Sequence, residues 1–133
     1  MKKSFISLVL SFLFILSIIA CKEQKESKKI NKNEITVTEL QQKILTDSNL
    51  VILDVRTPEE LTGPLGHIEG VINIPVQVLE KNLDKLEKYK EQEIYVICRS
   101  GNRSGVATKM LSGKGFKVKN VLGGMKKYNR IKK

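Results

Sequence analysis

The chain has 133 residues, 41% of them hydrophobic, and a formal net charge of +10. This length suits one domain with its own core. The excess charge suggests a nucleic-acid-binding protein, but residues 34–125 hold 12 basic and 12 acidic residues, so the excess lies at the two ends. Because a nucleic-acid footprint needs a basic stripe on the folded domain, the distribution argues against a nucleic-acid partner.

The first twenty residues have the pattern of an export signal. Lys2 and Lys3 precede a run over residues 4–20 in which serine is the only polar residue type. Such a run is typical of a secretory signal peptide and is slightly short for a bilayer crossing of about 20 residues. Its end, Ile18-Ile19-Ala20-Cys21, resembles the bacterial lipobox. The resemblance implies removal of residues 1–20 and lipidation of Cys21.

A lipidated Cys21 would anchor an exported protein to a membrane, on the periplasmic side or at the cell surface. A cleaved signal without lipid and an uncleaved membrane helix are the alternatives. Residues 21–33 hold five lysines and two glutamates, which predicts a solvated tether in front of a domain over residues 34–133. Cys98 would then be the only free thiol, which marks it as a candidate reactive residue in an oxidising compartment.

The domain alternates predicted helices and strands. A helix is expected over residues 38–45, opened by a capping box of Thr38 and Gln41. Strands are expected at 51–53, 72–74, 94–97 and 116–121, the last with edge-like alternation, and further helices at 57–60, 78–89 and 104–111. Strands separated by helices predict an α/β fold, with a parallel sheet covered by helices on both faces. Ligands of such sheets bind beyond the carboxyl ends of the strands.

The apolar strand 94–97 leads directly into Cys98, which is followed by a short polar loop and by a helix with Ser104 as its expected cap. Cysteine attacks as the thiolate, whose pKa is lowered by nearby guanidinium groups and by the N-terminus of a helix. Arg99 and Arg103 and the N–H groups of the loop offer both, so we expect an anion cradle around a nucleophilic Cys98. The alternative is a small, buried, structural cysteine.

Four phrases of the domain resemble, in the same order and spacing, those of the rhodanese family of sulfurtransferases. They are LDVRTPEE at 53–60, GHIEGVINIP at 66–75, VICRSGNRS at 96–104 and VLGGM at 121–125. The resemblance implies a single rhodanese-like domain with a five-stranded parallel sheet. It also implies that Cys98 is the catalytic residue. The substrate would be bound by Arg99, Ser100, Gly101, Asn102, Arg103 and Ser104.

The length of the loop distinguishes two chemistries of this fold. Four residues separate Cys98 from Arg103, which resembles sulfurtransferases, whereas the related phosphatases place five there to enclose a phosphate. The expected reaction moves a sulfane sulfur from a small donor such as thiosulfate, through a Cys98 persulfide, to cyanide, a thiol or a thioredoxin-like protein. A thiol-redox role and a non-catalytic binding module are the alternatives, and phosphatase or arsenate-reductase activity is a weaker one.

Three residues are expected to support the site rather than to react. Asp54 and Arg56 follow a central strand and are expected to hold neighbouring loops by charge-assisted hydrogen bonds. His67 is expected to stabilise a turn, since a thiol of low pKa needs no general base. The segment 61–65 is longer than in the commonest form of the family, which would reshape one pocket wall. The sequence indicates no cofactor and no metal ligand.

Overall fold

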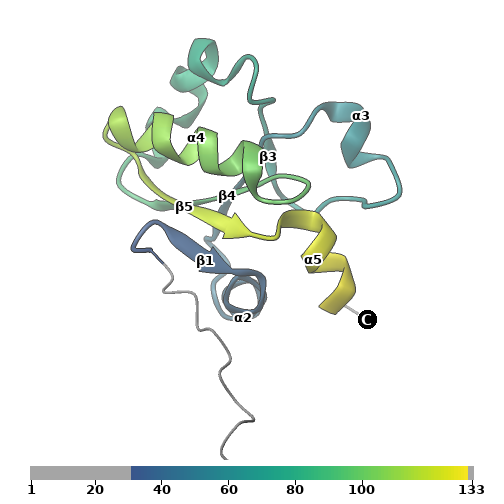
Figure 1. Cartoon of the computed structure of the whole chain (residues 1–133). Helices are drawn as coiled ribbons and strands as arrows, with labels where there is room; N and C mark the ends of the chain where they lie inside the picture. Colours follow the sequence, from purple (N-terminus) through teal and green to yellow (C-terminus); the bar gives the residue numbers. More distant parts are fainter. Residues whose placement is uncertain (1–30, 132–133) are drawn as a thin grey trace, which may run out of the picture.

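The computed structural model describes residues 31–131, which form an α/β domain around a five-stranded sheet (Figure 1). Its strands lie in the order β1-β5-β4-β2-β3, and all four pairings are parallel. They are β1 (Glu34–Thr36), β2 (Val51–Asp54), β3 (Ile72–Asn73), β4 (Glu93–Ile97) and β5 (Lys117–Leu122). The predicted fold class is confirmed.

Helices cover both faces of this sheet (Figure 1). They are α2 (Val37–Thr46), α3 (Pro58–Leu61), the 3₁₀ helix η1 (Leu79–Tyr89), α4 (Asn102–Gly113) and α5 (Gly124–Ile131). On one face, η1 and α4 pack Leu79, Leu86, Ala107 and Leu111 against the strands. On the other, α2 and α5 pack Val37, Leu40, Met125 and Tyr128.

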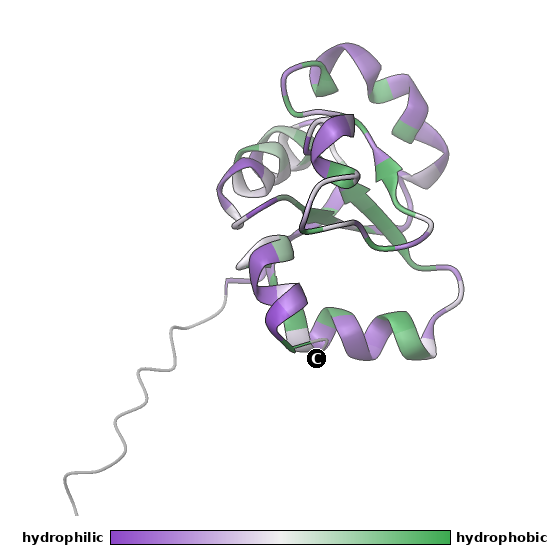
Figure 2. Ribbon diagram, turned by 90° about the vertical axis from the view of Figure 1, so that its right-hand side faces the viewer, coloured by the Kyte–Doolittle hydropathy of each residue, from purple (hydrophilic) through white to green (hydrophobic). Residues whose placement is uncertain are grey.

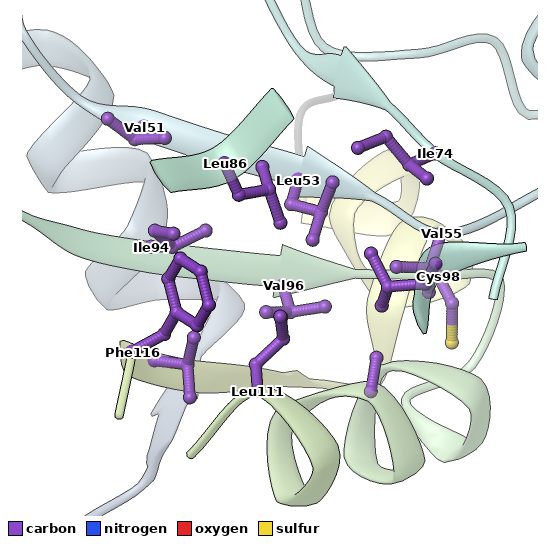
Figure 3. Close-up of a cluster of buried hydrophobic side chains, with 13 residues drawn as sticks. Val51, Leu53, Val55, Ile74, Leu86, Ile94, Val96, Cys98, Leu111 and Phe116 are labelled. Atoms are coloured by element: carbon purple, nitrogen blue, oxygen red, sulfur yellow. The ribbon is translucent and has the colours of Figure 1, made fainter. Parts of the chain in front are cut away.

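The two cores follow from the alternation of side chains along each strand. In β2, Val51 and Leu53 join the core under η1 and α4, whereas Ile52 joins the core under α2 and α5. The central strands β2 and β4 are mostly apolar, as expected for strands covered on both faces. Figure 2 shows green strands between helices of mixed colour. Cys98 lies at the edge of the first core, beside Val55 (Figure 3).

Two predicted helix starts are wrong. Helix α2 is capped by a box of Thr36 and Glu39 rather than by Thr38 and Gln41, because this start turns Val37 and Leu40 into the core. Helix α4 is capped by Gly101 rather than by Ser104. Ser104 instead lies in the first turn of α4, with its side chain buried.

The chain also differs from the sequence-based prediction at its last strand and beyond. β5 is not an edge strand, because it pairs with β1 on one side and β4 on the other. The basic stretch after it is helix α5, which buries Met125 and Tyr128 against the sheet. Val78, the first residue of the helix predicted over residues 78–89, is 42% exposed because η1 begins after it.

The segments predicted to be a signal peptide and most of a tether, with Cys21, lie outside the described residues. Among residues 31–131, no helix has both the length and the apolar character that a bilayer crossing requires.

Candidate active site

Cys98 lies directly after β4, at the carboxyl end of the central strands, where ligands of parallel sheets bind. The loop curls back over its sulfur and enters α4 through Gly101, whose φ is 101°. A Cβ on Gly101 would also come within 3.2 Å of the Gly123 nitrogen. Only glycine therefore allows this tight return of the chain.

The sulfur of Cys98 lies at the bottom of the loop, and the residue is only 1% exposed. The side chain is part of the hydrophobic core, and its Sγ lies within hydrogen-bond distance of polar groups of the loop. A reactant must therefore reach the sulfur through the mouth of the loop, which favours a small group.

Hydrogen-bond donors of the loop converge on this sulfur. The Gly101 N–H lies 3.1 Å and the Ser104 Oγ 3.3 Å from Sγ. Burial alone would raise the pKa of the Cys98 thiol, but the Ser104 hydroxyl and the N–H groups of Ser104, Ser100 and Gly101 outweigh it and hold that pKa below its ordinary value. The main stabilisation of the thiolate thus comes from the loop and the start of α4 rather than from the guanidinium groups that the sequence emphasised.

Ser104 connects the sulfur to strand β5. Its Oγ lies 2.6 Å from Oδ1 of the buried Asn120, as well as 3.3 Å from Cys98 Sγ. Because a hydroxyl carries one proton, Ser104 donates to only one of these acceptors at a time. Asn120 was missed from the sequence, since a polar residue in a strand carries no signal of a partner sixteen residues earlier.

Ser104→Ala is expected to raise the pKa of Cys98, because it removes a hydrogen bond to the thiolate, and such a bond to a charged group contributes about 1.5–3 kcal/mol. Less thiolate is then present at each pH below the new pKa, so the pH profile of alkylation by iodoacetamide shifts upward. Ser112→Ala removes an exposed hydroxyl from the same helix and is the matched control. An unshifted profile for Ser104→Ala would contradict this role.

Arg103 is held by Glu60 of helix α3. Its two terminal nitrogens lie 2.6 and 2.7 Å from the two carboxylate oxygens of Glu60. These hydrogen bonds lower the pKa of Glu60 to about 2. The same carboxylate accepts the Thr57 N–H at the start of α3. Arg103 therefore joins α4 to α3 at the mouth of the loop.

Asp54 and Arg56 form a buried ion pair below this mouth, with side chains 0% and 1% exposed. The Arg56 Nη2 lies 2.7 Å from the Asp54 carboxylate. Arg56 also donates from Nη1 to the Glu60 carbonyl, at 3.1 Å, and from Nη2 to the Gly66 carbonyl, at 2.8 Å. The pair thus holds both ends of the segment 61–66, which borders the site.

Helix α5 fixes the backbone of the loop from the other side. The Met125 N–H donates to the Cys98 carbonyl at 2.8 Å, and the Lys126 N–H donates to the Arg99 carbonyl at 3.0 Å. Gly124, with φ 53°, lets this turn lie directly against the loop. The VLGGM phrase therefore acts by positioning the loop.

The remaining predicted residues are at the rim. Arg99, Ser100 and Asn102 are exposed, and Ser100 contributes its backbone N–H to the sulfur. His67 is exposed as well, with Nδ1 3.1 Å from the Leu61 carbonyl, so it bridges a turn away from the sulfur. Within residues 31–131, no three His, Cys, Asp or Glu side chains are grouped to hold a metal ion.

Comparisons with known proteins agree with this geometry. The family model for the rhodanese-like domain matches residues 36–131. Over 94 residues the chain is 43% identical to the Bacillus subtilis protein named "Putative sulfur carrier protein YrkF", covering 70% of this chain and 49% of that protein. Over 93 residues it is 41% identical to "Putative sulfurtransferase YtwF" of the same organism, covering 69% and 85%. This chain thus spans about half the length of YrkF.

Among solved structures, a rhodanese-like domain protein from Staphylococcus aureus superimposes with a TM-score of 0.66 at 33% identity. The match covers 72% of this chain and 90% of that one. The whole described domain, rather than the cysteine loop alone, is therefore shared.

Proposed function

The chain belongs to the rhodanese-like domain family, and from that premise we propose that it is a sulfurtransferase that carries sulfane sulfur as a persulfide on Cys98. The observation that carries the proposal is the convergence of the Gly101 N–H and the Ser104 hydroxyl on the Cys98 sulfur, at 3.1 and 3.3 Å. Donors aimed at one sulfur stabilise an anion there, whether it is a thiolate or the terminal sulfur of a persulfide.

The first half-reaction would load the cysteine. The Cys98 thiolate attacks the outer sulfur of thiosulfate, a new S–S bond forms, and the original S–S bond breaks. Its electron pair leaves with sulfite, and the negative charge of the thiolate moves to the terminal sulfur of Cys98–S–S⁻. The exposed Arg99 lies beside the attacking residue and would attract the anionic donor.

The second half-reaction would remove the outer sulfur from the Cys98 persulfide. An acceptor thiol attacks the outer sulfur, the S–S bond between this sulfur and Cys98 Sγ breaks, and the Cys98 thiolate is regenerated. The proton of the acceptor thiol passes to the transferred sulfur, so that Cys98–S–S⁻ and RSH give Cys98–S⁻ and RSSH. Cyanide would accept the same sulfur to give thiocyanate. Because the residue Cys98 is only 1% exposed, the acceptor must in each case have a reacting group narrow enough to enter the loop.

Mass spectrometry after incubation with thiosulfate tests the proposal. We expect one added sulfur, mapped to the peptide of Cys98 and absent in Cys98→Ser, together with loss of all measurable thiocyanate formation in that variant. Peptide mapping separates Cys98 from Cys21. A wild-type protein that remains unmodified but forms mixed disulfides through Cys98 would instead indicate thiol redox chemistry, and retained transfer by Cys98→Ser would exclude a persulfide on this residue.

We also propose that the domain acts at a membrane surface, tethered through a lipid on Cys21. The support is the basic start, the apolar run and the Ile18-Ile19-Ala20-Cys21 end of the first segment. Metabolic labelling with palmitate is expected to mark the wild type and not Cys21→Ser. Labelling of both proteins would contradict the proposal.

A further inference from the structure

A pocket of about 500 Å³ lies beside the Cys98 loop and is not used by the two half-reactions. This volume is within the range of small-molecule sites, about 300–1,000 Å³. Its lining includes Pro64 and Leu65 of the long segment after α3, Glu59 and Glu60 of α3, and the basic residues Arg99 and Lys126.

The pocket adjoins the loop that holds the reactive sulfur, because Arg99 belongs to both. Arg99 is the neighbour of Cys98 in the chain, and the Lys126 N–H donates to the Arg99 carbonyl at 3.0 Å. Glu60 connects the pocket to the other end of the loop through its two hydrogen bonds with Arg103. A molecule in the pocket would therefore lie at the mouth through which the sulfur is reached.

The apolar wall of the pocket is held in place. The Asn129 side chain donates to the Leu65 carbonyl at 2.8 Å, and the Gly66 N–H closes a turn on the Gly63 carbonyl at 2.8 Å. Arg56 fixes the Gly66 carbonyl from below at 2.8 Å. A preformed wall binds a ligand without the cost of ordering a loop.

The charges of the pocket are unbalanced. Arg56 and Arg103 are paired with Asp54 and Glu60. Among residues 31–131, by contrast, no carboxylate lies within ion-pair distance of Arg99 or Lys126, and both are exposed. Glu59 also lines the pocket, and its carboxylate has no ion-pair partner among residues 31–131. The lining therefore holds two cations and one carboxylate without ion-pair partners, so one positive charge is in excess.

We propose that this pocket binds the sulfur acceptor and that the acceptor is a small organic thiol bearing a carboxylate. The carboxylate lies between Arg99 and Lys126, and the carbon skeleton lies against Pro64 and Leu65. This inference rests on the proposed function, since it assigns the acceptor of the second half-reaction. The thiol of the bound molecule attacks the outer sulfur of the Cys98 persulfide, and RSSH leaves with the thiol proton.

The test measures unloading of the full-length protein after complete loading with thiosulfate. Second-order rate constants are compared for 3-mercaptopropionate and the neutral 2-mercaptoethanol, in the wild type and in Lys126→Gln. For each thiol, the rate constant of the variant is divided by that of the wild type, so that the intrinsic reactivity of the thiol cancels. Lys127→Gln is the matched control, because it removes the same charge one residue further along α5 and does not line the pocket.

We expect Lys126→Gln to slow unloading by 3-mercaptopropionate about threefold to fivefold more than unloading by 2-mercaptoethanol. This is the effect of losing one partly exposed ion pair. Lys127→Gln should leave the ratio of the two rates at its wild-type value. Equal slowing of both thiols, or no slowing, would overturn the pocket assignment while leaving the persulfide intact. A wild type that never loads sulfur would refute the proposed function instead.

Discussion

Arg56→Ala is expected to lower the free energy of unfolding by about 3–5 kcal/mol, because removal of one member of a buried ion pair leaves an unpaired charge. The remaining Asp54 carboxylate is 0% exposed and would lose three hydrogen bonds, from Nε to both of its oxygens and from Nη2. The carbonyls of Glu60 and Gly66 would lose their donors as well. Urea denaturation followed by circular dichroism measures the change.

The matched control is Lys117→Ala. Lys117 pairs with Glu91 at 3.0 Å, but the two side chains are 59% and 89% exposed, so its loss should cost less than about 1 kcal/mol. In the double variant Asp54→Ala/Arg56→Ala, the cost should be smaller than the sum of the single costs, because neither charge is left alone. An Arg56→Ala cost as small as that of Lys117→Ala would show that the pair is not structural.

Gly124→Ala is expected to slow persulfide formation on Cys98 about 100-fold, since misplacing a reactive group by about 1 Å has an effect of that size. A Cβ at this position would lie 2.8 Å from the Arg99 carbonyl carbon and from the Ser100 nitrogen. It would also meet the Cys98 carbonyl, to which the neighbouring Met125 N–H donates. The φ of 53° adds strain for alanine. The loop must therefore shift.

Stopped-flow loading with thiosulfate, at a temperature where the far-UV spectrum of the variant is native, measures the effect. Gly113→Ala is the control: it lies at the end of α4, has no atom within 4 Å of its added Cβ and should load at the wild-type rate. Unchanged loading by Gly124→Ala would mean that α5 does not position the loop.

The sequence predicted the parts of the molecule that depend on local pattern. Because the Cys98 loop is continuous in the chain, its order of residues alone indicates that the backbone donors and the sulfur lie together. The cap of α2 shows the limit of this reasoning. Thr36 with Glu39 and Thr38 with Gln41 both have capping-box spacing, and only the burial of the side chains on the sheet decides between them.

The missing parts of the site come from distant residues. Glu60 holds Arg103 from 43 positions away, and no local pattern specifies that contact. Helix α5 was not predicted, although Met125 and Tyr128, three positions apart, have the spacing of the apolar face of an amphipathic helix. In eight residues such a face is too short to be recognised without the sheet beneath it.

The strand order has a consequence for synthesis of the protein on the ribosome. β1 is made first among the strands and β5 last, yet β1 pairs only with β5, and β5 separates it from β4. An emerging chain therefore cannot complete its sheet before residue 122 has left the exit tunnel, and the α5 contacts that fix the loop form later still. Cys98 and the donors of its loop are thus made well before the helix that positions them, and the chain acquires the geometry for its chemistry only when α5 packs against the loop.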